Sequence, residues 1–459
     1  MEATATKLEL ETWRLRTLVL RVTIVGGLLP LLLGADWSQF RGPRGDGHCQ
    51  ANNLPTNWGG FFQQPVWQTS IPGFGWSSPI VHGERIWLTA AEVTALTEDE
   101  LQERIAATPF SEMEPFQAHG SVTLLAVEVD LRTGEVLRRL ELLSHRNPTP
   151  IHLANSYASP TPVTDGERLY CHFGSLGTMA ISLQTGEHVW RQTFDGNDLT
   201  GPGNSPVLVD DLLVLTCDGA DDQFVVAIEK RTGNIAWRTS RPASPVSEGR
   251  LRRAFSTPLL VEFGGRQQLI APAAQFTVAY DPSNGLELWR VRMGSGHAVV
   301  PRPVFQHGLV YVCSGYPQPE LLAVRVDGSG DVTQTHVAWR YGKQVPHISS
   351  PILVGNEIYF VSSMGIATCL DSQSGERRWQ QRLRGRFSAS PLFADGKLYF
   401  TNEQGVTTVL RPGHEFQRLA RNQLFGETRA SIAVAGESLL IRTAPALYCI
   451  KKPVLNQED

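Results

Sequence analysis

A spacing of eight residues between a strand-opening proline and an aromatic or apolar residue recurs along the whole chain. A Gly or Asp lies between the two partners in the regular copies, as expected for a tight turn that joins two short strands. Pro258 opens a further copy with extra residues around Gly264-Gly265, and Ile432 with Leu440 forms a degenerate last copy. The regular pairs are Pro79 with Trp87, Pro162 with Tyr170, Pro206 with Val214, Pro303 with Tyr311, Pro351 with Tyr359, and Pro391 with Tyr399.

Two more columns repeat in register with this spacing. Small residues precede a hydrophobic residue in the third strand of each unit, at Ala126, Ala180, Ala227, Ala279, Ala323, Cys369, Val409 and Cys449. About ten residues later stands a second column, made of Trp190, Trp237, Trp289 and Trp379, with Trp339 placed after an insertion and Leu419 as the replacement in the seventh copy. We expect the small residues to let neighbouring sheets approach closely, and the tryptophans to fill the space between them.

Eight such units predict an all-β fold, an eight-bladed β-propeller. The eighth copy ends near Lys451 without a fourth strand, whereas residues 65–69 supply a strand with Trp67 that has no unit of its own. We therefore expect the N-terminal strand to close the last blade, because closure removes the open sheet edges. One propeller domain is predicted over residues 65–455, followed by a tail at 456–459.

Two regions depart from the period. The first copy carries an insertion at about residues 90–121, in which Thr97 and Glu100 have the spacing of a capping box and predict a short helix through Ile105. Residues 36–64 are rich in Gly, Asn and Pro. We expect this segment to lie as an ordered loop over one face, and we expect three aromatic side chains to hold it there, Trp37, Phe40 and Trp58.

The first 35 residues differ in composition from the rest. Basic residues between Lys7 and Arg21 precede an apolar run at 22–33, which ends at Gly34-Ala35. This order predicts a secretory signal peptide over residues 1–35, and hence a periplasmic or secreted protein. The run is short for a permanent anchor, so an uncleaved anchor or a misassigned start is the alternative, and no membrane span is expected after cleavage.

The net charge bears on the binding partner, and the placement of the cysteines bears on whether disulfides form. The net charge of −4 gives no overall attraction to nucleic acid or to anionic membranes, and no nucleic-acid partner is expected. An exported chain with six cysteines could carry disulfides. However, Cys171, Cys217 and Cys313 end second strands, and Cys369 and Cys449 occupy one repeated strand position. We expect the strand cysteines to be small buried hydrophobic residues.

The copies resemble PQQ-type propeller repeats, as in Ala180-Ile181, Thr185-Gly186-Glu187 and Trp190, and again in Cys369-Leu370-Asp371, Ser374-Gly375-Glu376 and Trp379. Residues 36–451 resemble the secreted PQQ-binding-like β-propeller repeat proteins, including WSQFRGP at 37–43 and NSYASPTP at 155–162. The resemblance implies the fold. It leaves function open, because such repeats occur in quinoprotein dehydrogenases, in the BamB-type outer-membrane assembly scaffold and in sensor modules.

A quinoprotein alcohol dehydrogenase would hold PQQ near the axis, between a Trp and a disulfide of adjacent cysteines, with Ca²⁺ on acidic and Asn side chains and an Asp as base. This chain has no adjacent cysteines. Acidic clusters at 195–198 and 218–222 lack EF-hand spacing, and solvated turns are the preferred interpretation. The scattered histidines lack the spacing of a zinc site. We therefore predict no catalytic residue, metal or cofactor, and keep PQQ with Ca²⁺ as an alternative.

One polar pattern suggests a binding site. Four arginines lie just before first strands, and in a propeller those connections meet at one mouth of the central channel. Guanidinium groups there could bind an anionic ligand or an acidic peptide loop, and the alternative is that they bond backbone carbonyls between blades. The residues of this hypothesis are Arg253, Arg302, Arg386 and Arg429, with His347 and Asn204 beside them.

These observations favour a monomeric, non-catalytic, exported propeller that acts as a scaffold for an envelope or extracellular protein partner. The loop-rich N-terminal segment and the insertion offer surfaces for such contacts. Two alternatives stay open. One is a PQQ-dependent oxidoreductase, and the other is a ligand-sensing module that works with an envelope partner.

Overall fold

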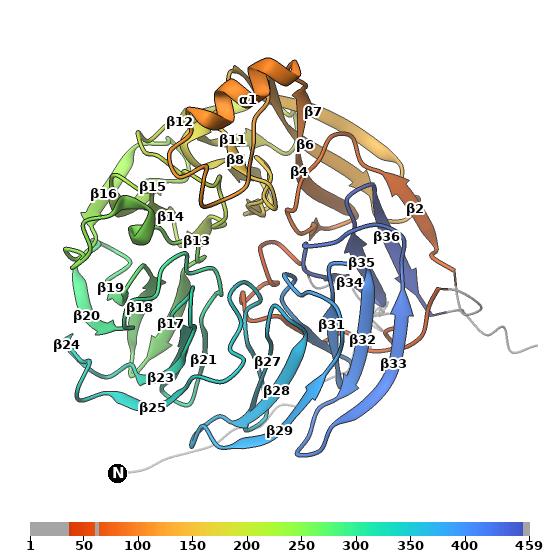
Figure 1. Ribbon diagram of the computed structural model, residues 1–459. Coiled ribbons are helices and arrows are strands. Elements are labelled where there is room, and N and C mark those ends of the chain that lie inside the picture. Colours follow the sequence, from red (N-terminus) through yellow and green to blue (C-terminus); the bar gives the residue numbers. More distant parts are fainter. Residues whose placement is uncertain (1–35, 60–63, 453–459) are drawn as a thin grey trace, which may run out of the picture. The chain divides into compact units, whose positions relative to one another are not determined.

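The computed structural model describes residues 36–59 and 64–452, which belong to one compact unit. The predicted signal peptide at 1–35 and the predicted tail at 456–459 lie outside the described residues. Within the described part, eight sheets of at least four strands follow one another around a central axis (Figure 1). The predicted eight-bladed β-propeller is therefore confirmed.

Each of the first four blades is an antiparallel meander whose first strand lies nearest the axis (Figure 1). Blade 1 contains β3 (Ile80–His82), β4 (Arg85–Thr94), β6 (Ser121–Asp130) and β7 (Val136–Arg146). Blade 2 contains β9 (Val163–Thr164), β10 (Arg168–His172), β11 (Thr178–Ser182) and β12 (His188–Gln192). Blade 3 contains β13 (Val207–Val209), β14 (Leu212–Asp218), β15 (Gln223–Glu229) and β16 (Ile235–Ser240). Blade 4 contains β17 (Leu259–Phe263), β18 (Arg266–Pro272), β19 (Phe276–Tyr280) and β20 (Glu287–Arg292).

The last four blades repeat this plan. Blade 5 contains β21 (Val304–Gln306), β22 (Leu309–Cys313), β23 (Leu321–Arg325) and β25 (Val337–Tyr341). Blade 6 contains β26 (Ile352–Val354), β27 (Glu357–Val361), β28 (Ile366–Asp371) and β29 (Arg377–Arg382). Blade 7 contains β30 (Leu392–Ala394), β31 (Lys397–Thr401), β32 (Val406–Arg411) and β33 (Gln417–Gln423). Blade 8 contains β34 (Ala433–Ala435), β35 (Ser438–Arg442), β36 (Ala446–Lys451) and, from the other end of the chain, β2 (Trp67–Ser70).

A few elements lie outside this plan. β1 (His48–Cys49) pairs in parallel with β30, and β24 (Gly330–Asp331) pairs in parallel with β20. The insertion in blade 1 contains helix α1 (Glu98–Ala106), which begins with a capping box between Thr97 and Glu100. The same insertion supplies β5 (Phe116–Gln117), which pairs with β8 (Ile151–His152). Two short 3-10 helices cover Gly174–Leu176 and Gly249–Arg252.

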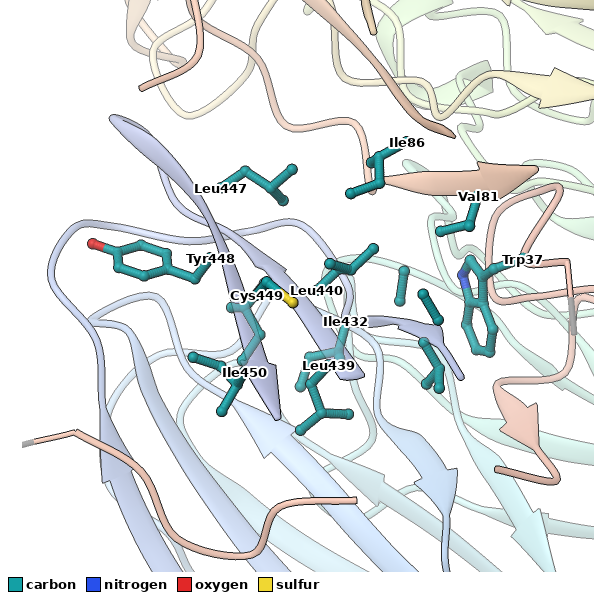
Figure 2. Packing of buried hydrophobic residues seen from close by; sticks show 14 of the residues in the cluster. Trp37, Val81, Ile86, Ile432, Leu439, Leu440, Leu447, Tyr448, Cys449 and Ile450 are labelled. Carbon is teal, nitrogen blue, oxygen red and sulfur yellow. The ribbon is translucent and has the colours of Figure 1, made fainter. Parts of the chain in front are cut away.

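Pairing of β2 with β36 closes the ring, as the sequence predicts. Trp67 lies opposite Cys449, and Ser70 lies opposite Ala446, in antiparallel register. Figure 2 shows the buried residues around this junction, where Leu440 and Cys449 of blade 8 and Ile86 of blade 1 belong to one cluster. Trp37, from the N-terminal segment, belongs to the same cluster and is 1% exposed. Burying this apolar surface offsets the entropy of bringing the two ends of the chain together.

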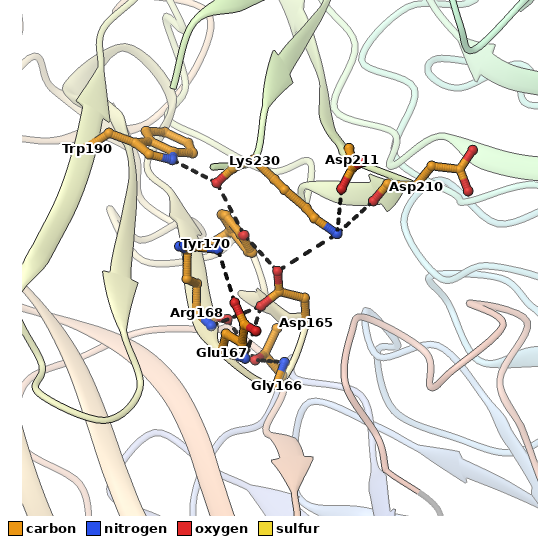
Figure 3. Close-up of polar contacts among 10 residues, drawn as sticks. Asp165, Gly166, Glu167, Arg168, Tyr170, Trp190, Asp210, Asp211 and Lys230 are labelled. Atoms are coloured by element: carbon orange, nitrogen blue, oxygen red, sulfur yellow. Dashed lines mark hydrogen bonds and ion pairs between the residues drawn. The ribbon is translucent and has the colours of Figure 1, made fainter. Parts of the chain in front are cut away.

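The tryptophans of the outer strands connect each blade to the next one. Figure 3 shows one case, in which the indole N–H of Trp190 donates to the carbonyl of Lys230, in the turn that ends β15 of blade 3. Four more tryptophans donate across a blade boundary in the same way, from Trp67 to Leu131, from Trp237 to Pro282, from Trp339 to Ser372 and from Trp379 to Gly413, each at 3.0 Å. A buried indole N–H needs such an acceptor, so packing and hydrogen bonding act together here.

The glycine of the turn makes this contact possible. Gly285 has φ +74°, and a Cβ atom there would collide with the Trp237 ring of the preceding blade. Gly134, Gly233 and Gly375 lie against Trp67, Trp190 and Trp339 in the same manner. The repeated Thr-Gly, Asn-Gly and Ser-Gly turns therefore serve two purposes, because they reverse the chain and receive the neighbouring tryptophan.

Strand register corrects two positions of the predicted columns. In blade 1 it is Glu128, and not Ala126, that lies opposite Trp87, and Arg138 occupies the tryptophan position. Arg138 donates to Glu128 and to the carbonyl of Leu183 in blade 2, so a partly buried ion pair replaces the indole. In blade 7 Val409 lies opposite Ala420, and not Leu419. In blade 1 the insertion interrupts the spacing between the second and third strands, and in blade 7 the paired positions are one residue further apart than in blades 2, 3, 4 and 6.

Trp289 follows a variant of the pattern. Its indole N–H donates to the Gln268 side chain of its own blade, at 2.7 Å. The amide nitrogen of Gln268 donates in turn to the carbonyl of Val326 in blade 5, at 2.9 Å. Gln268 therefore links Trp289 to blade 5, which lacks the usual Gly turn at this position.

Substitution of Gly285 tests the contact between turn and tryptophan. Gly285→Ala should destabilise the protein by about 1–2 kcal/mol from the left-handed backbone alone, and by about 1–3 kcal/mol more because the methyl group displaces Trp237. Gly396→Ala is the matched control, because Gly396 has φ +68° and no atom lies within 4 Å of its Cβ position. Urea unfolding of the two variants should give the larger loss for Gly285→Ala. Equal losses would contradict the role given to the contact.

Candidate functional site

A cavity of about 580 Å³ lies on the axis of the ring. It is lined by residues that precede the first strands, such as Trp76, Arg253 and Arg429, and by loops that join second and third strands. In an antiparallel blade these two kinds of connection lie at the same end of the sheet. The cavity therefore belongs to one face of the ring, which we call the mouth face.

A ring of hydroxyl groups surrounds the axis inside the cavity. Before the first strand of blades 1, 2, 3, 6, 7 and 8, a backbone N–H donates to a hydroxyl of the next blade, at 2.9–3.0 Å. The hydroxyls belong to Ser78, Thr161, Ser205, Thr257, Ser350, Ser390 and Ser431, all of which line the cavity. These bonds satisfy backbone N–H groups that lie outside the strand pairings, and they connect neighbouring blades at the axis.

Arg302 takes the place of a hydroxyl residue in blade 5. Its backbone N–H still donates to Ser350, at 2.9 Å, while its guanidinium donates to the carbonyls of Pro258 and Phe40, at 3.2 and 2.7 Å. The side chain is 2% exposed, and burial together with the nearby Arg41 lowers the pKa of Arg302 to about 9. Arg302 thus attaches the N-terminal segment to the axis.

The N-terminal segment crosses the ring at the end opposite to the mouth face. The carbonyls of Trp37, Ser38 and Gly47 accept backbone N–H groups near the far ends of three first strands, β3, β9 and β30. Arg41 is buried and donates to the carbonyl of Pro351, at 2.8 Å. Phe40 lines the cavity from this side. Access to the cavity is therefore from the mouth face.

The insertion of blade 1 forms part of the cavity wall. Met113, Glu114 and Pro115 line the cavity, and the Glu114 carboxylate accepts a hydrogen bond from Arg253, at 2.9 Å. This ion pair connects the insertion to the segment between blades 3 and 4, across the mouth. Arg253 also donates to Thr200, at 3.0 Å, and is 2% exposed.

The three arginines that line the cavity, Arg250, Arg253 and Arg429, each have a carboxylate beside them, and so does the neighbouring Arg386. Arg250 pairs with Glu248, and Arg253 pairs with Glu114. Arg386 lies 3.6 Å from the buried Glu403, and Arg429 contacts Glu403 at 3.4 Å and Glu427 at 2.7 Å. The mouth is therefore close to charge balance. It presents hydrogen-bonding groups to an occupant instead of a concentrated positive field.

Histidine and aromatic rings form the rest of the wall. Tyr316 contacts His297 and His347, with ring centroids 5.5 and 5.8 Å apart. The guanidinium of Arg429 lies 5.5 Å from the centre of the Trp76 ring. Burial lowers the pKa of His152 and of His297 below the ordinary value for histidine, so both rings are neutral at physiological pH.

The structure distributes the six predicted site residues over three environments. Arg253, His347 and Arg429 line the cavity together. Arg302 binds backbone carbonyls, as the alternative interpretation of the pattern supposes, and Arg386 is exposed outside the cavity. The Asn204 amide donates to the carbonyl of Thr216, at 2.7 Å, and Asn204 borders a separate hollow of about 30 Å³.

Several lining residues, and the exposed apolar side chains around them, were not predicted from the sequence. Seven large apolar side chains are exposed in the connections of the mouth face, and we call them the mouth rim: Phe74, Met113, Leu153, Tyr316, Ile348, Met364 and Phe425. Met113 is 68% exposed and Phe425 is 80% exposed. Their signal in the sequence is an apolar residue inside a connection, where turn residues are expected. Met113, Tyr316 and Ile348 also line the cavity, and exposed apolar side chains beside a cavity are a feature of interaction sites.

The described residues do not fit the ligand set of a Ca²⁺–PQQ site. Within residues 36–59 and 64–452, no three His, Cys, Asp or Glu side chains gather closely enough to hold a metal ion. All six cysteines are free, and four of them are buried in strands. Asp218, in one of the acidic clusters, is buried against Arg241 at 2.8 Å and does not lie in a solvated turn. The carboxylates at the mouth already bind arginines.

Comparisons with known proteins agree with this architecture. The family model described as outer membrane protein assembly factor BamB matches residues 124–381 and 331–452. The structure of BamB from Moraxella catarrhalis is 13% identical, with TM-score 0.53, and the match covers 85% of this chain and 99% of that one. A europium-containing methanol dehydrogenase is 10% identical, with TM-score 0.56 and 90% coverage of both chains. The computationally designed protein Ika8 is 10% identical, with TM-score 0.50, over 73% of this chain and 93% of that one.

Identities this low establish the fold alone. No curated protein matches the chain in sequence. None of the described helices has the length and apolar character that a membrane span requires.

Substitution of Glu114 tests whether the insertion is held in the cavity wall. Glu114→Gln removes the ion pair with Arg253, so we expect a loss of about 1 kcal/mol. Amide hydrogen exchange at residues 107–120 should become roughly fivefold faster, while exchange in the blades is unchanged. Glu112→Gln is the control, because Glu112 makes none of the ion pairs found in the described residues. Unchanged exchange in Glu114→Gln would show that the pair does not hold the insertion.

Proposed function

The chain belongs to the PQQ-like propeller family described as outer membrane protein assembly factor BamB, and from that premise we propose that it is a non-catalytic scaffold. Its mouth face binds a partner protein of the cell envelope or the extracellular space. The partner inserts a loop into the axial cavity and covers the mouth rim. The observation that carries this proposal is the gathering of exposed apolar side chains around a cavity that opens at the same face.

The chemistry of the mouth supports a protein partner. Tyr316 and Ile348 both line the cavity and are 55% and 37% exposed. Aromatic and apolar side chains at the centre, with ion-paired arginines around them, are typical of protein interfaces. A charge-balanced cavity suits a loop that carries both apolar and hydrogen-bonding groups.

The proposal assigns partner contact to Arg253, His347 and Arg429. Arg253 donates to the Glu114 carboxylate. A carboxylate on the inserted loop would accept a hydrogen bond from the same guanidinium and would take the place of Glu114. Arg302, Arg386 and Asn204 are assigned a supporting role, since none of them lines the cavity. The partner loop is therefore expected to combine an acidic residue with apolar neighbours.

The same proposal places the protein outside the cytoplasm. Residues 1–35 have the order of a signal peptide, and the ring from residue 65 onward closes without them. We expect the protein recovered from the periplasm or the medium to begin near residue 36. Intact-mass measurement tests this, and recovery of the full-length chain would contradict it.

The alternative is a PQQ-dependent oxidoreductase, which the fold shared with a methanol dehydrogenase brings into consideration. Bound PQQ would supply a two-electron redox centre. The nitrogen and hydroxyl groups that would face it are those of Arg253, Arg429 and the hydroxyl ring, but the described carboxylates offer no Ca²⁺ ligand set. Stoichiometric uptake of PQQ with Ca²⁺ by purified protein, followed by dye reduction, would favour this alternative over the scaffold.

Site-specific photo-crosslinking tests the scaffold. A photoreactive residue in place of Ile348 or Phe425 should give one discrete protein adduct in cells, because both positions lie on the mouth rim. Mass spectrometry would identify the partner. Adducts should disappear when a second substitution, Tyr316→Asp, places a charge in the proposed interface.

Leu286 and Ile235 are the control positions. They are 66% and 50% exposed and belong to outer turns and strands away from the mouth face. Photoreactive residues there should give no adduct of that mass. The same adduct from all four positions, or none from the rim, would contradict the proposal.

A further inference from the structure

Two arginine side chains are buried close to each other at the closed end of the axis. Arg41 belongs to the N-terminal segment and Arg302 to the connection before blade 5, and each is 2% exposed. The Arg302 guanidinium donates to the carbonyl of Phe40, the residue directly before Arg41, at 2.7 Å. Burial and the neighbouring charge of Arg41 both lower the pKa of Arg302. Two like charges are therefore held together away from water.

The Arg41 guanidinium has nitrogen atoms without an acceptor. Its Nη2 atom donates to the carbonyls of Asp46 and Pro351, at 3.0 and 2.8 Å. Its Nε and Nη1 atoms are buried, and neither finds an acceptor within residues 36–59 and 64–452. Buried donors are seldom left unsatisfied in native proteins, above all on a charged group. These nitrogens therefore point to an acceptor that is not part of the described chain.

The charges around Arg41 indicate what kind of acceptor this is. Among the described residues, no carboxylate forms an ion pair with Arg41 or Arg302. Asp46 attracts both arginines, but its carboxylate accepts from Arg44, at 2.9 Å, and from the backbone N–H of His48, at 3.0 Å. Burial lowers the pKa of His48, so its ring adds no positive charge at neutral pH. Three arginines beside one aspartate leave an excess of positive charge, which favours an anion over water.

Arg41 differs in this respect from other buried arginines of the ring. Arg241 is buried against the Asp218 carboxylate, at 2.8 Å. Arg442 has no carboxylate beside it, but its Nη1 atom donates to three oxygens of blade 1, and Nε is its one nitrogen without an acceptor among the described residues. Arg41 lacks a carboxylate, leaves two nitrogens without an acceptor and has a second arginine nearby. An unpaired charge is costly to bury, so a counterion is expected there first.

The loop that carries Arg41 encloses both guanidinium groups. Gly45 has φ +68°, and a Cβ atom there would collide with the Arg302 guanidinium. Gly47 has φ +84°, and a Cβ atom there would collide with the Arg41 guanidinium. Neither arginine lines the axial cavity. An acceptor of the Arg41 Nη1 atom is therefore surrounded by protein, and a monatomic anion suits such a place better than a phosphate or a carboxylate.

We propose that a chloride ion binds the free nitrogens of Arg41, close to Arg302, and completes the closed end of the axis. Chloride would accept the N–H groups that the described chain leaves unsatisfied, and it would offset part of the excess positive charge. Both arginines hold the N-terminal segment, so the ion would stabilise the crossing of this segment over the ring. Neither arginine is assigned to partner contact, and the inference is therefore independent of the proposed function.

The chloride dependence of unfolding tests the inference. Urea unfolding of the purified protein is measured while chloride replaces gluconate at constant ionic strength, so that general screening does not change. Above the dissociation constant, each tenfold rise in chloride should lower the equilibrium constant for unfolding about tenfold, because only the folded protein binds the ion. Amide hydrogen exchange at residues 37–47 should become slower over the same range.

Arg41→Gln should abolish this dependence, because it removes the charge and the Nη1 atom. Arg44→Gln is the matched control. It removes one positive charge from the same loop, but from a side chain that is 64% exposed, and should keep the tenfold dependence. An unchanged dependence in Arg41→Gln would indicate that the anion binds elsewhere on the protein and would overturn the inference.

Bromide in crystals gives an answer that requires no variant, should Arg41→Gln fail to fold. Crystals of the unaltered protein grown with bromide in place of chloride should show an anomalous peak within hydrogen-bonding distance of the Arg41 Nη1 atom. A map without this peak would contradict the proposal, and so would unfolding of the unaltered protein that does not respond to chloride. In either case water would be the acceptor of these nitrogens.

Discussion

The contact between a tryptophan of one blade and the glycine turn of the next is the interaction on which the ring depends. A four-stranded sheet has two faces, and neither is covered until a neighbour packs on it. The indole of Trp237 fills the gap and its N–H binds the carbonyl of Pro282, while Gly285 lets the turn come close enough. Repetition of this contact fixes the angle between blades. Where the tryptophan is absent, Arg138 with Glu128 keeps the same connection to the next turn.

Around the axis, a second set of contacts decides which face can receive a ligand. The hydroxyl ring ties the inner strands together but leaves the centre open. Arg302 and Arg41 then hold the N-terminal segment across one end, and Phe40 reaches the cavity from there. The polar groups that remain are those of the other end, where Arg253, His297 and Tyr316 meet. The N-terminal segment therefore decides which end of the axial cavity is open.

Repeat spacing was sufficient to predict the number of blades and the closing strand, because both are properties of the backbone period. The contact between the Trp and Gly columns was not predicted, since the partners are about 45 residues apart and belong to different blades. Ala126 and Leu419 were predicted in place of Glu128 and Ala420, because the insertion of blade 1 and one additional residue in blade 7 change the spacing on which the prediction rests. For the site, the arginines were recognised individually, but their carboxylate partners come from the insertion and from other blades, as Glu114 and Glu403 do.

Closure by β2 has a consequence for the order of events during synthesis. Residues 67–70 leave the ribosome long before their partner strand at 446–451 is made. Until then the outer edge of blade 8 does not exist, and the opening strand has nothing to pair with. The final cooperative step must therefore wait for a complete chain, which makes premature folding difficult. Closure of the ring is in this way coupled to the synthesis of β36.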